Sequence, residues 1–235
     1  MSTFYFKKFS IKQDNTAMKV GTDAMLLGSF IDVSVKERGL DIGAGTGVLA
    51  CMLAQQKSDL VVDAIEMEDN AFEELKYNVN NASFSSQIHP IHGDVLNHQP
   101  NYNYDLIVSN PPYFEDTYLS EDNGRNLARH VLELTPVKLL SLSHKLLSDK
   151  GDLWVIIPSK NVSEWQVNAE NVGFHFSTEI IIMGVPGRHV RSIIRFSKQN
   201  HPKLSHVFVI RDENGHYTNE YKDRTLEFHI KPPIR

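Results

Sequence analysis

The stretch LDIGAGTG, residues 40–47, decides the fold of this chain. Its first three residues end an apolar run, the next five carry three glycines, and an apolar run over 48–53 follows. Glycine lets a backbone turn sharply or approach a ligand closely. The order therefore predicts a buried strand, a tight glycine loop and a buried helix. The spacing G-x-G-x-G is one residue shorter than the G-x-G-x-x-G fingerprint of dinucleotide-binding folds.

Acidic residues follow three of the expected strands and suggest the kind of ligand. Asp41 lies at the end of the first strand, where its carboxylate would repel a pyrophosphate and attract a cation. Glu66 ends the apolar strand 60–65 and can accept hydrogen bonds from ribose hydroxyls. The tripeptide 93–95, Gly-Asp-Val, ends a third strand and could hold an adenine edge. A nucleoside with a positive, phosphate-free tail is expected here, so S-adenosylmethionine fits better than NAD.

The tetrapeptide Asn110-Pro111-Pro112-Tyr113 follows a further apolar strand, 104–109. Each proline holds the residue before it in an extended conformation, so this loop is stiff. The Asn110 amide and the Pro111 carbonyl are two acceptors, and Tyr113 offers a stacking face. That set suits a planar exocyclic amine such as the one on adenine. The alternative is a plain Pro-Pro turn in which the asparagine caps the strand.

Strands and helices alternate along the chain, which predicts an α/β fold with a largely parallel sheet. Strands are expected near 38–42, 60–66, 87–92, 104–109 and 151–157, and helices near 46–57, 69–82, 136–148 and 161–172. Thr135 is the expected cap of the third helix, with proline at its first position. Two β-rich runs, 174–183 and 190–197, are joined by a Pro-Gly turn, and a short strand over 207–210 precedes an Asn-Gly turn.

The ordered motifs DIGAGTG, IEMEDNAFEELKYNVNNA, GDV and SNPPY resemble those of class I S-adenosylmethionine-dependent amino-methyltransferases. The segments 17–28 and 215–221 are similar to the bacterial tRNA1(Val) (adenine-37-N6)-methyltransferases, and this resemblance covers nearly the whole chain. It implies a Rossmann-like α/β fold: a seven-stranded, mostly parallel sheet with an antiparallel last strand and helices on both faces. It also implies one methyltransferase domain over 1–235, with an N-terminal segment 1–36, a core 37–200 and a C-terminal extension 201–235.

The resemblance also assigns roles to residues. It implies N6-methylation of an adenine in a tRNA anticodon loop, at position 37 of a valine tRNA. The catalytic positions are Asn110, Pro111 and Tyr113. The cofactor-binding positions are Thr22, Asp23, Asp41, Gly43, Ala44, Gly45, Gly47, Glu66, Met67, Asp94, Val95 and Asn110.

The net charge of −5 does not itself indicate nucleic-acid binding, so RNA would have to meet local basic groups. Lys7, Lys8 and Lys12 stand among aromatic residues that could stack bases, although an edge strand with alternating burial explains the same pattern. Arg125 and Arg129 lie in a polar stretch that could equally be a solvated loop. Residues 184–191 carry further basic side chains, and there a plain hairpin turn is favoured over an RNA contact.

Other classes of protein are less consistent with the composition. The single cysteine, Cys51, lies in an apolar helix and suits core packing in a reducing cytosol. No apolar run is long enough to cross a bilayer and the N-terminus lacks the order of a signal peptide, so a cytoplasmic protein is expected. His89, His92 and His98 have no accompanying cysteine, so no metal site is expected. The sequence leaves the oligomeric state open.

Three rival functions share parts of this pattern. A protein-glutamine methyltransferase would use the same acceptors, but such enzymes usually carry a helical domain before the core, where residues 1–36 stand here. A guanine-N2 rRNA methyltransferase often has Phe in place of Tyr113, and an added domain. A catalytically silent cofactor-binding partner is the third rival, and the intact glycine loop and Asn-Pro-Pro-Tyr motif argue against it.

Overall fold

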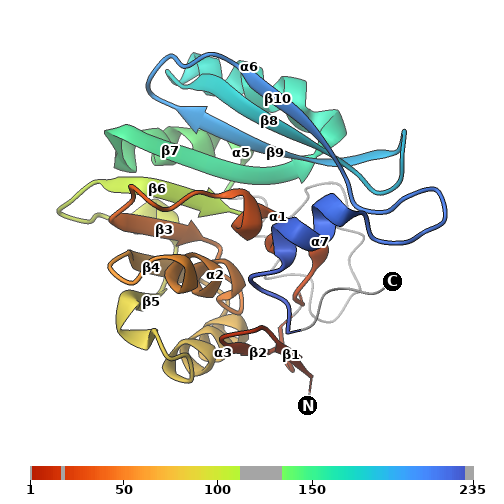
Figure 1. The fold of residues 1–235 in the computed structure, drawn as a ribbon. Coiled ribbons are helices and arrows are strands. Elements are labelled where there is room, and N and C mark those ends of the chain that lie inside the picture. Colours follow the sequence, from red (N-terminus) through yellow and green to blue (C-terminus); the bar gives the residue numbers. More distant parts are fainter. Residues whose placement is uncertain (1, 17–18, 112–133, 231–235) are drawn as a thin grey trace, which may run out of the picture.

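An eight-stranded sheet runs through the protein and carries helices on both faces (Figure 1). The computed structural model describes residues 2–16, 19–111 and 134–230. The strands follow the order β10-β8-β9-β7-β6-β3-β4-β5 across the sheet. Their bounds are β3 Arg38–Ile42, β4 Val61–Glu66, β5 Ile88–His92, β6 Tyr104–Ser109, β7 Leu147–Pro158, β8 His175–Met183, β9 His189–Ser197 and β10 Leu204–Val209.

The predicted sheet type is confirmed, and the predicted strand count is wrong by one. Only β9 is antiparallel to its neighbours, β7 and β8, among the strand pairs of this sheet in the described residues. The eighth strand is β10, which pairs in parallel with the outer edge of β8. A hydrophobic pattern indicates a strand over these residues, but it does not say that the strand extends the main sheet.

The helices form one layer on each face of the sheet. Residues of α1 (Thr22–Phe30), α2 (Val48–Gln56), α3 (Asp69–Asn80) and α7 (Asn219–Thr225) belong to one hydrophobic cluster. Residues of α5 (Pro136–Leu146) and α6 (Val162–Asn171) belong to a second cluster on the opposite face. Successive strand residues contribute to opposite clusters, as Leu106 and Ile107 of β6 do, because side chains alternate across a sheet.

The N-terminal hairpin packs against α3. Strands β1 (Thr3–Tyr5) and β2 (Ser10–Lys12) pair antiparallel, and the rings of Phe6 and Phe9 stack at 4.3 Å and are buried. Burial removes these two rings from the set that could stack bases. The carboxylate of Glu74 on α3 accepts hydrogen bonds from the backbone just after β2.

Two helices and one boundary differ from the expectation. The helix α1 was not predicted because it is apolar all round, with residues 24–29 buried, and so shows no amphipathic period. The helix α7 was not predicted either, because it is short. Thr218 caps it by accepting a hydrogen bond from the Tyr221 backbone N–H. The strand β7 begins at Leu147, inside the range expected for a helix, because Leu147 pairs with Tyr104 of β6 before a register shift.

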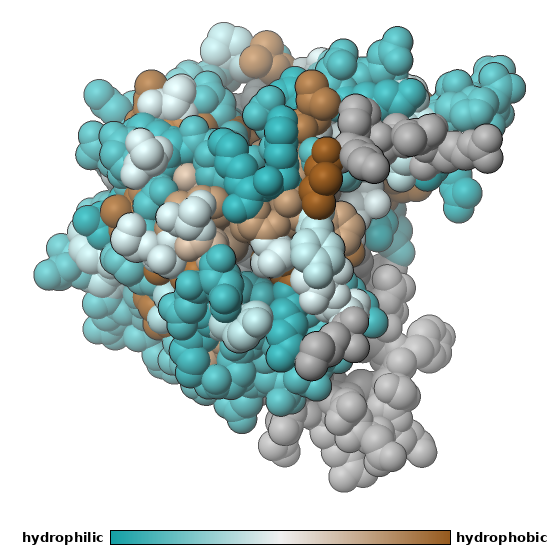
Figure 2. All heavy atoms as spheres, turned by 60° about the horizontal axis from the view of Figure 1, so that its bottom comes forward, coloured by the Kyte–Doolittle hydropathy of each residue, from teal (hydrophilic) through white to brown (hydrophobic). Residues whose placement is uncertain are grey.

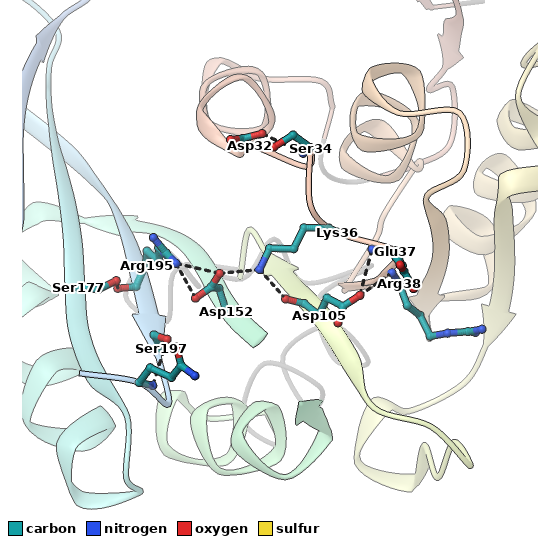
Figure 3. Close-up of polar contacts among 11 residues, drawn as sticks. Asp32, Ser34, Lys36, Glu37, Arg38, Asp105, Asp152, Ser177, Arg195 and Ser197 are labelled. Atoms are coloured by element: carbon teal, nitrogen blue, oxygen red, sulfur yellow. Dashed lines mark hydrogen bonds and ion pairs between the residues drawn. The ribbon is translucent and has the colours of Figure 1, made fainter. Parts of the chain in front are cut away.

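A buried ion network joins the segment before β3 to β6, β7 and β9 at the amino end of the parallel strands (Figure 3). Lys36, which precedes β3, places its Nζ 2.7 Å from Asp152 Oδ2 on β7 and 3.0 Å from the Asp105 carbonyl on β6. Arg195 on β9 donates to Asp152 Oδ2 at 3.1 Å. Buried charges are expensive unless paired, so this network needs all of its members.

Candidate active site

The expected site residues meet at the carboxyl ends of the central strands. Ile42 of β3 lies in register with Ile65 of β4 and with Ser109 of β6. The glycine loop leaves β3 and is fixed to β4, because the backbone N–H groups of Gly43 and Ala44 both donate to the Ile65 carbonyl at 3.0 Å. In open α/β sheets this edge is where ligands bind.

The glycines of the loop serve two different purposes. Gly43, Gly45 and Gly47 all have a positive φ, which L side chains rarely adopt. A Cβ on Gly43 or Gly45 would meet no atom within 4 Å, so the loop faces open space at those positions. A Cβ on Gly47 would come within 2.6 Å of Leu75 Cδ1 on α3. Gly43 and Gly45 thus leave room for a ligand, whereas Gly47 permits close packing of helix and loop.

Glu66 holds the loop as well as facing the site. One carboxylate oxygen accepts from the Gly45 backbone N–H at 2.7 Å, and the other accepts from the N–H groups of Met67 and Glu68 at 2.8 and 2.9 Å. An ionised carboxylate has about four acceptor positions, so the partly exposed Glu66 retains capacity for a hydroxyl donor. The Glu66 carbonyl also accepts from Gly93 N–H, which connects the next loop to this one.

Asp41 lies beneath the loop and is fully buried. Its Oδ2 accepts from the Ala50 backbone N–H on α2 at 3.1 Å, and its Oδ1 has no hydrogen-bond partner among the described residues. Burial raises the pKa of Asp41 from 3.8 to about 7; the Ala50 bond opposes that rise and the Glu66 charge adds to it. Asp41 has no exposed surface for direct contact, so its expected attraction for a cationic ligand would act through the loop.

The raised pKa of Asp41 predicts a pH-dependent effect of Asp41→Asn on stability. Because the folded-state pKa exceeds the unfolded one, wild-type stability falls as pH rises from 3.8 through about 7. Asparagine does not titrate, so the variant should gain on the wild type over that range, by a few kcal/mol in all, and the difference should level off above it. Urea denaturation at pH 4.5, 6 and 8 measures this, and a difference independent of pH would contradict it.

Asn110 directly follows the last residue of β6 and lies beside the start of the glycine loop. The preceding residue, Ser109, pairs with Ile42 and also donates from its hydroxyl to the Ile42 carbonyl at 2.9 Å. Asn110 is partly exposed and Pro111 is buried. The structure therefore brings the first two expected catalytic residues to the glycine loop. The third, Tyr113, lies outside the described residues, as do Arg125 and Arg129.

The remaining expected cofactor residues lie around this edge. Thr22 and Asp23 begin α1, and Asp23 Oδ2 accepts from Arg191 Nε on β9 at 2.9 Å. Asp94 Oδ1 accepts from the Leu96 backbone N–H at 2.9 Å, and Val95 is buried next to it. Arg191 was not expected at the site, because nothing in the sequence indicates its pairing with a residue 168 positions away.

The three histidines considered for a metal have separate partners. His89 lies 3.1 Å from Asp63, His92 lies 3.2 Å from Asp69, and His98 lies 2.8 Å from the Tyr104 hydroxyl. Within the described ranges, no group of three or more metal-ligating side chains is arranged to hold an ion. No helix in those ranges is long and apolar enough to cross a membrane.

Known proteins resemble this chain in sequence. The Methyltransferase small domain family matches residues 16–170. The tRNA1(Val) (adenine(37)-N6)-methyltransferase of Flavobacterium johnsoniae is 37% identical over 97% of this chain and 99% of its own length. The enzyme of the same name from Trichodesmium erythraeum is 37% identical over 97% of this chain and 98% of its own. The chain belongs to the family of tRNA1(Val) (adenine(37)-N6)-methyltransferases.

Solved structures agree with the fold. A protein of Agrobacterium tumefaciens described as a predicted O-methyltransferase has a TM-score of 0.69 over 88% of this chain and 96% of its own, at 20% identity. A class I S-adenosylmethionine-dependent methyltransferase of Listeria monocytogenes, described as putative, has a TM-score of 0.55 over 79% of this chain and 62% of its own, at 16% identity. At such identities the likeness concerns the fold alone.

Proposed function

We propose that this methyltransferase transfers a methyl group from S-adenosylmethionine to N6 of an adenine in a tRNA anticodon loop, at adenine 37 of a valine tRNA. The observation that carries the proposal is the register of β3 and β6, which sets Asn110 and Pro111 directly beside the glycine loop. The names of the family members supply the tRNA and the position. A tRNA substrate also implies a cytoplasmic enzyme.

The cofactor fits the residues at this edge. The open space over Gly43 and Gly45 can receive it, and the spare acceptor capacity of Glu66 suits ribose hydroxyls. Burial favours the neutral form of the Asp41 carboxyl, and a cationic centre nearby would favour its ionised form. The backbone at Met67 and at Asp94–Val95 borders the expected position of the adenine. When bound, S-adenosylmethionine supplies the methyl group from its sulfonium sulfur.

The reaction asks the protein to make a poor nucleophile attack. The N6 lone pair of adenine is delocalised into the ring. The Asn110 amide oxygen and the Pro111 carbonyl would accept hydrogen bonds from the two N–H bonds of the adenine N6 amine. These hydrogen bonds would favour a pyramidal nitrogen, on which the lone pair is localised. As positive charge develops on that nitrogen, the two oriented dipoles stabilise it. The stiff strand-end loop holds the amine in place, which supplies the positioning contribution. Stacking on Tyr113 would hold the target base out of its stack.

Glu66→Ala should weaken S-adenosylmethionine binding. The change removes an acceptor for the ribose and also frees the Gly45 N–H, so the loss should be at least that of one hydrogen bond to a charged group, about 1.5–3 kcal/mol. Titration calorimetry measures the affinity. Glu73→Ala, on the exposed face of α3, is the matched control and should leave the affinity unchanged. Unaltered affinity in Glu66→Ala, or tight binding of NAD to the wild type, would refute this assignment.

The proposed RNA contacts at Lys7 and Lys8 predict a change in salt dependence. Both lysines are exposed at the turn of the N-terminal hairpin, where phosphates can reach them. Replacing both with alanine should weaken tRNA binding and reduce its slope against the logarithm of salt concentration by just under one unit for each phosphate that is no longer neutralised. Filter binding at several salt concentrations measures this. The control is the double variant Lys145→Ala/Lys150→Ala, which removes two exposed lysines of α5 and β7. An equal slope in both double variants would exclude the hairpin lysines as phosphate contacts.

A methyl-transfer assay on mixed substrates tests the proposed function against its rivals. The enzyme is incubated with tritiated S-adenosylmethionine and with tRNA, rRNA or protein from a strain that lacks the gene. Label is expected in tRNA. Label in protein would favour a glutamine methyltransferase, label in rRNA a guanine methyltransferase, and no label in any fraction a catalytically silent partner.

A further inference from the structure

A small groove lies between the N-terminal hairpin and α3, outside the cofactor site. Its volume is about 260 Å³ and it is lined by Thr3, Tyr5, Ser10, Lys12, Tyr77 and Asn81. Binding sites for whole small molecules usually measure about 300–1,000 Å³, so this groove suits a single flat ring rather than a larger ligand. None of the roles assigned above uses its tyrosines.

The two tyrosine rings are exposed although the hairpin already has an aromatic core. Tyr5 is 64% exposed and Tyr77 is 52% exposed, whereas Phe6 and Phe9 are buried and anchor the hairpin. The packing of the hairpin therefore does not require either ring. Lys12 holds its Nζ 5.0 Å from the centre of the Tyr77 ring and 3.8 Å from Asp14 Oδ2, so the groove contains an ammonium group that is partly balanced by one carboxylate.

These groups match the chemistry of an unpaired nucleotide. Exposed aromatic rings stack bases of any sequence, and a lysine beside them meets the phosphate. The hydroxyls of Thr3 and Ser10 and the amide of Asn81 can bond the polar edge of a base. Figure 2 turns the bottom of Figure 1 forward, and on this face hydrophilic residues predominate with hydrophobic residues interspersed among them. Nucleic acid fits such a face better than a protein partner, which needs a larger apolar centre.

One buried side chain links the groove to the glycine loop. Asn78, the neighbour of Tyr77 on α3, donates to the carbonyls of Lys12 and of Thr46 at 2.9 Å each and accepts from the Lys12 N–H at 2.8 Å. Thr46 belongs to the glycine loop. A base bound in the groove is therefore held by the same framework that positions the cofactor.

We propose that this groove binds an unpaired nucleotide of the RNA substrate, near the adenine that is methylated. This inference rests on the proposed function for the identity of the RNA. Stacking in the groove would help to hold the unfolded loop on the enzyme while the target base occupies the catalytic site. The groove would thus read single-stranded character, not sequence.

Alanine and phenylalanine variants of the two tyrosines test the groove. Tyr77→Ala and Tyr5→Ala should each raise the Kd for tRNA and its KM by roughly tenfold, whereas the Phe variants should stay within about twofold of the wild type. The affinity for S-adenosylmethionine should not change. Val137→Ala truncates a side chain that is 48% exposed on the opposite face of the sheet, and is the control. Melting temperatures within a few degrees of the wild type show that every variant is folded.

Binding of short RNAs separates this inference from the proposed function. A single-stranded oligoribonucleotide should lose roughly tenfold in affinity on Tyr77→Ala, and the same sequence as a duplex should lose little. That result supports the groove even if the wild type methylates no tRNA, which would refute the proposed function alone. A wild type that methylates tRNA, with both alanine variants equal to it in Kd and KM, would overturn the groove and leave the proposed function standing.

Discussion

Asn110→Ala is expected to lower kcat by about two to three orders of magnitude, while the affinity for S-adenosylmethionine stays nearly unchanged. In the proposed mechanism, the Asn110 amide oxygen accepts a hydrogen bond that strengthens as positive charge develops on the attacking nitrogen. Its loss therefore raises the energy of the transition state more than that of the bound substrate. The cofactor should be little affected, because Gly43 follows β3 and Glu66 ends β4, whereas Asn110 follows β6.

Single-turnover methylation with saturating tRNA measures the chemical step, and calorimetry measures cofactor binding. Asn101→Ala, an exposed asparagine that precedes β6, serves as the matched control and should behave as the wild type. A variant of Asn110 with full activity would show that the amide has no part in the reaction. An equal loss of cofactor affinity and rate would instead assign Asn110 to cofactor binding.

Asp152→Ala is expected to lower the free energy of unfolding by about 3–5 kcal/mol, because it leaves a buried charge without its partner. Lys36 is only 8% exposed, and Asp152 Oδ2 is the anion nearest to its Nζ, at 2.7 Å. Arg195 loses the same partner. The Asp105 carbonyl still accepts from Lys36, but a neutral acceptor does not balance the charge. Urea denaturation at pH 7 measures the change.

Asp149→Ala is the control for the network, since Asp149 is exposed on the same strand, and it should change stability by less than about 0.5 kcal/mol. A double variant sharpens the test. Adding Lys36→Met to Asp152→Ala removes the unpaired charge and should recover part of the loss, because apolar replacement of a buried ion pair is often tolerated. A loss below about 1 kcal/mol in the single variant would mean that water reaches Lys36 in solution.

Local signals were sufficient for much of the fold and for the centre of the site. The glycine loop, the strand ends at Asp41 and Glu66, and the Thr135 cap of α5 all depend on neighbouring residues, and the structure places these elements as expected. Their convergence at one edge follows from the rule that parallel strands present their carboxyl ends together. The same rule places Asn110 at that edge, whereas its position directly beside Gly43 depends on the pairing of β6 with β3.

The features that could not be predicted depend on packing between distant segments. The burial of Asp41, the pairing of Asp23 with Arg191 and the ion network at Lys36 each require knowledge of which elements pack together. The same is true of β10 beside β8 and of the exposed Tyr77 beside the hairpin. The prediction missed the helix α1 for a different reason, since a helix that is apolar all round shows no hydrophobic period.

We propose above that the target is N6 of adenine 37 in a valine tRNA. The most direct measurement is mass spectrometry of that tRNA, unmodified at the start and treated with the enzyme and S-adenosylmethionine, first as nucleosides and then as nuclease fragments. We expect one N6-methyladenosine, in the fragment that contains position 37, and far less of it in the same time when Asn110→Ala replaces the wild type. A methyl group on guanine, or N6-methyladenosine only outside the anticodon loop, would contradict it.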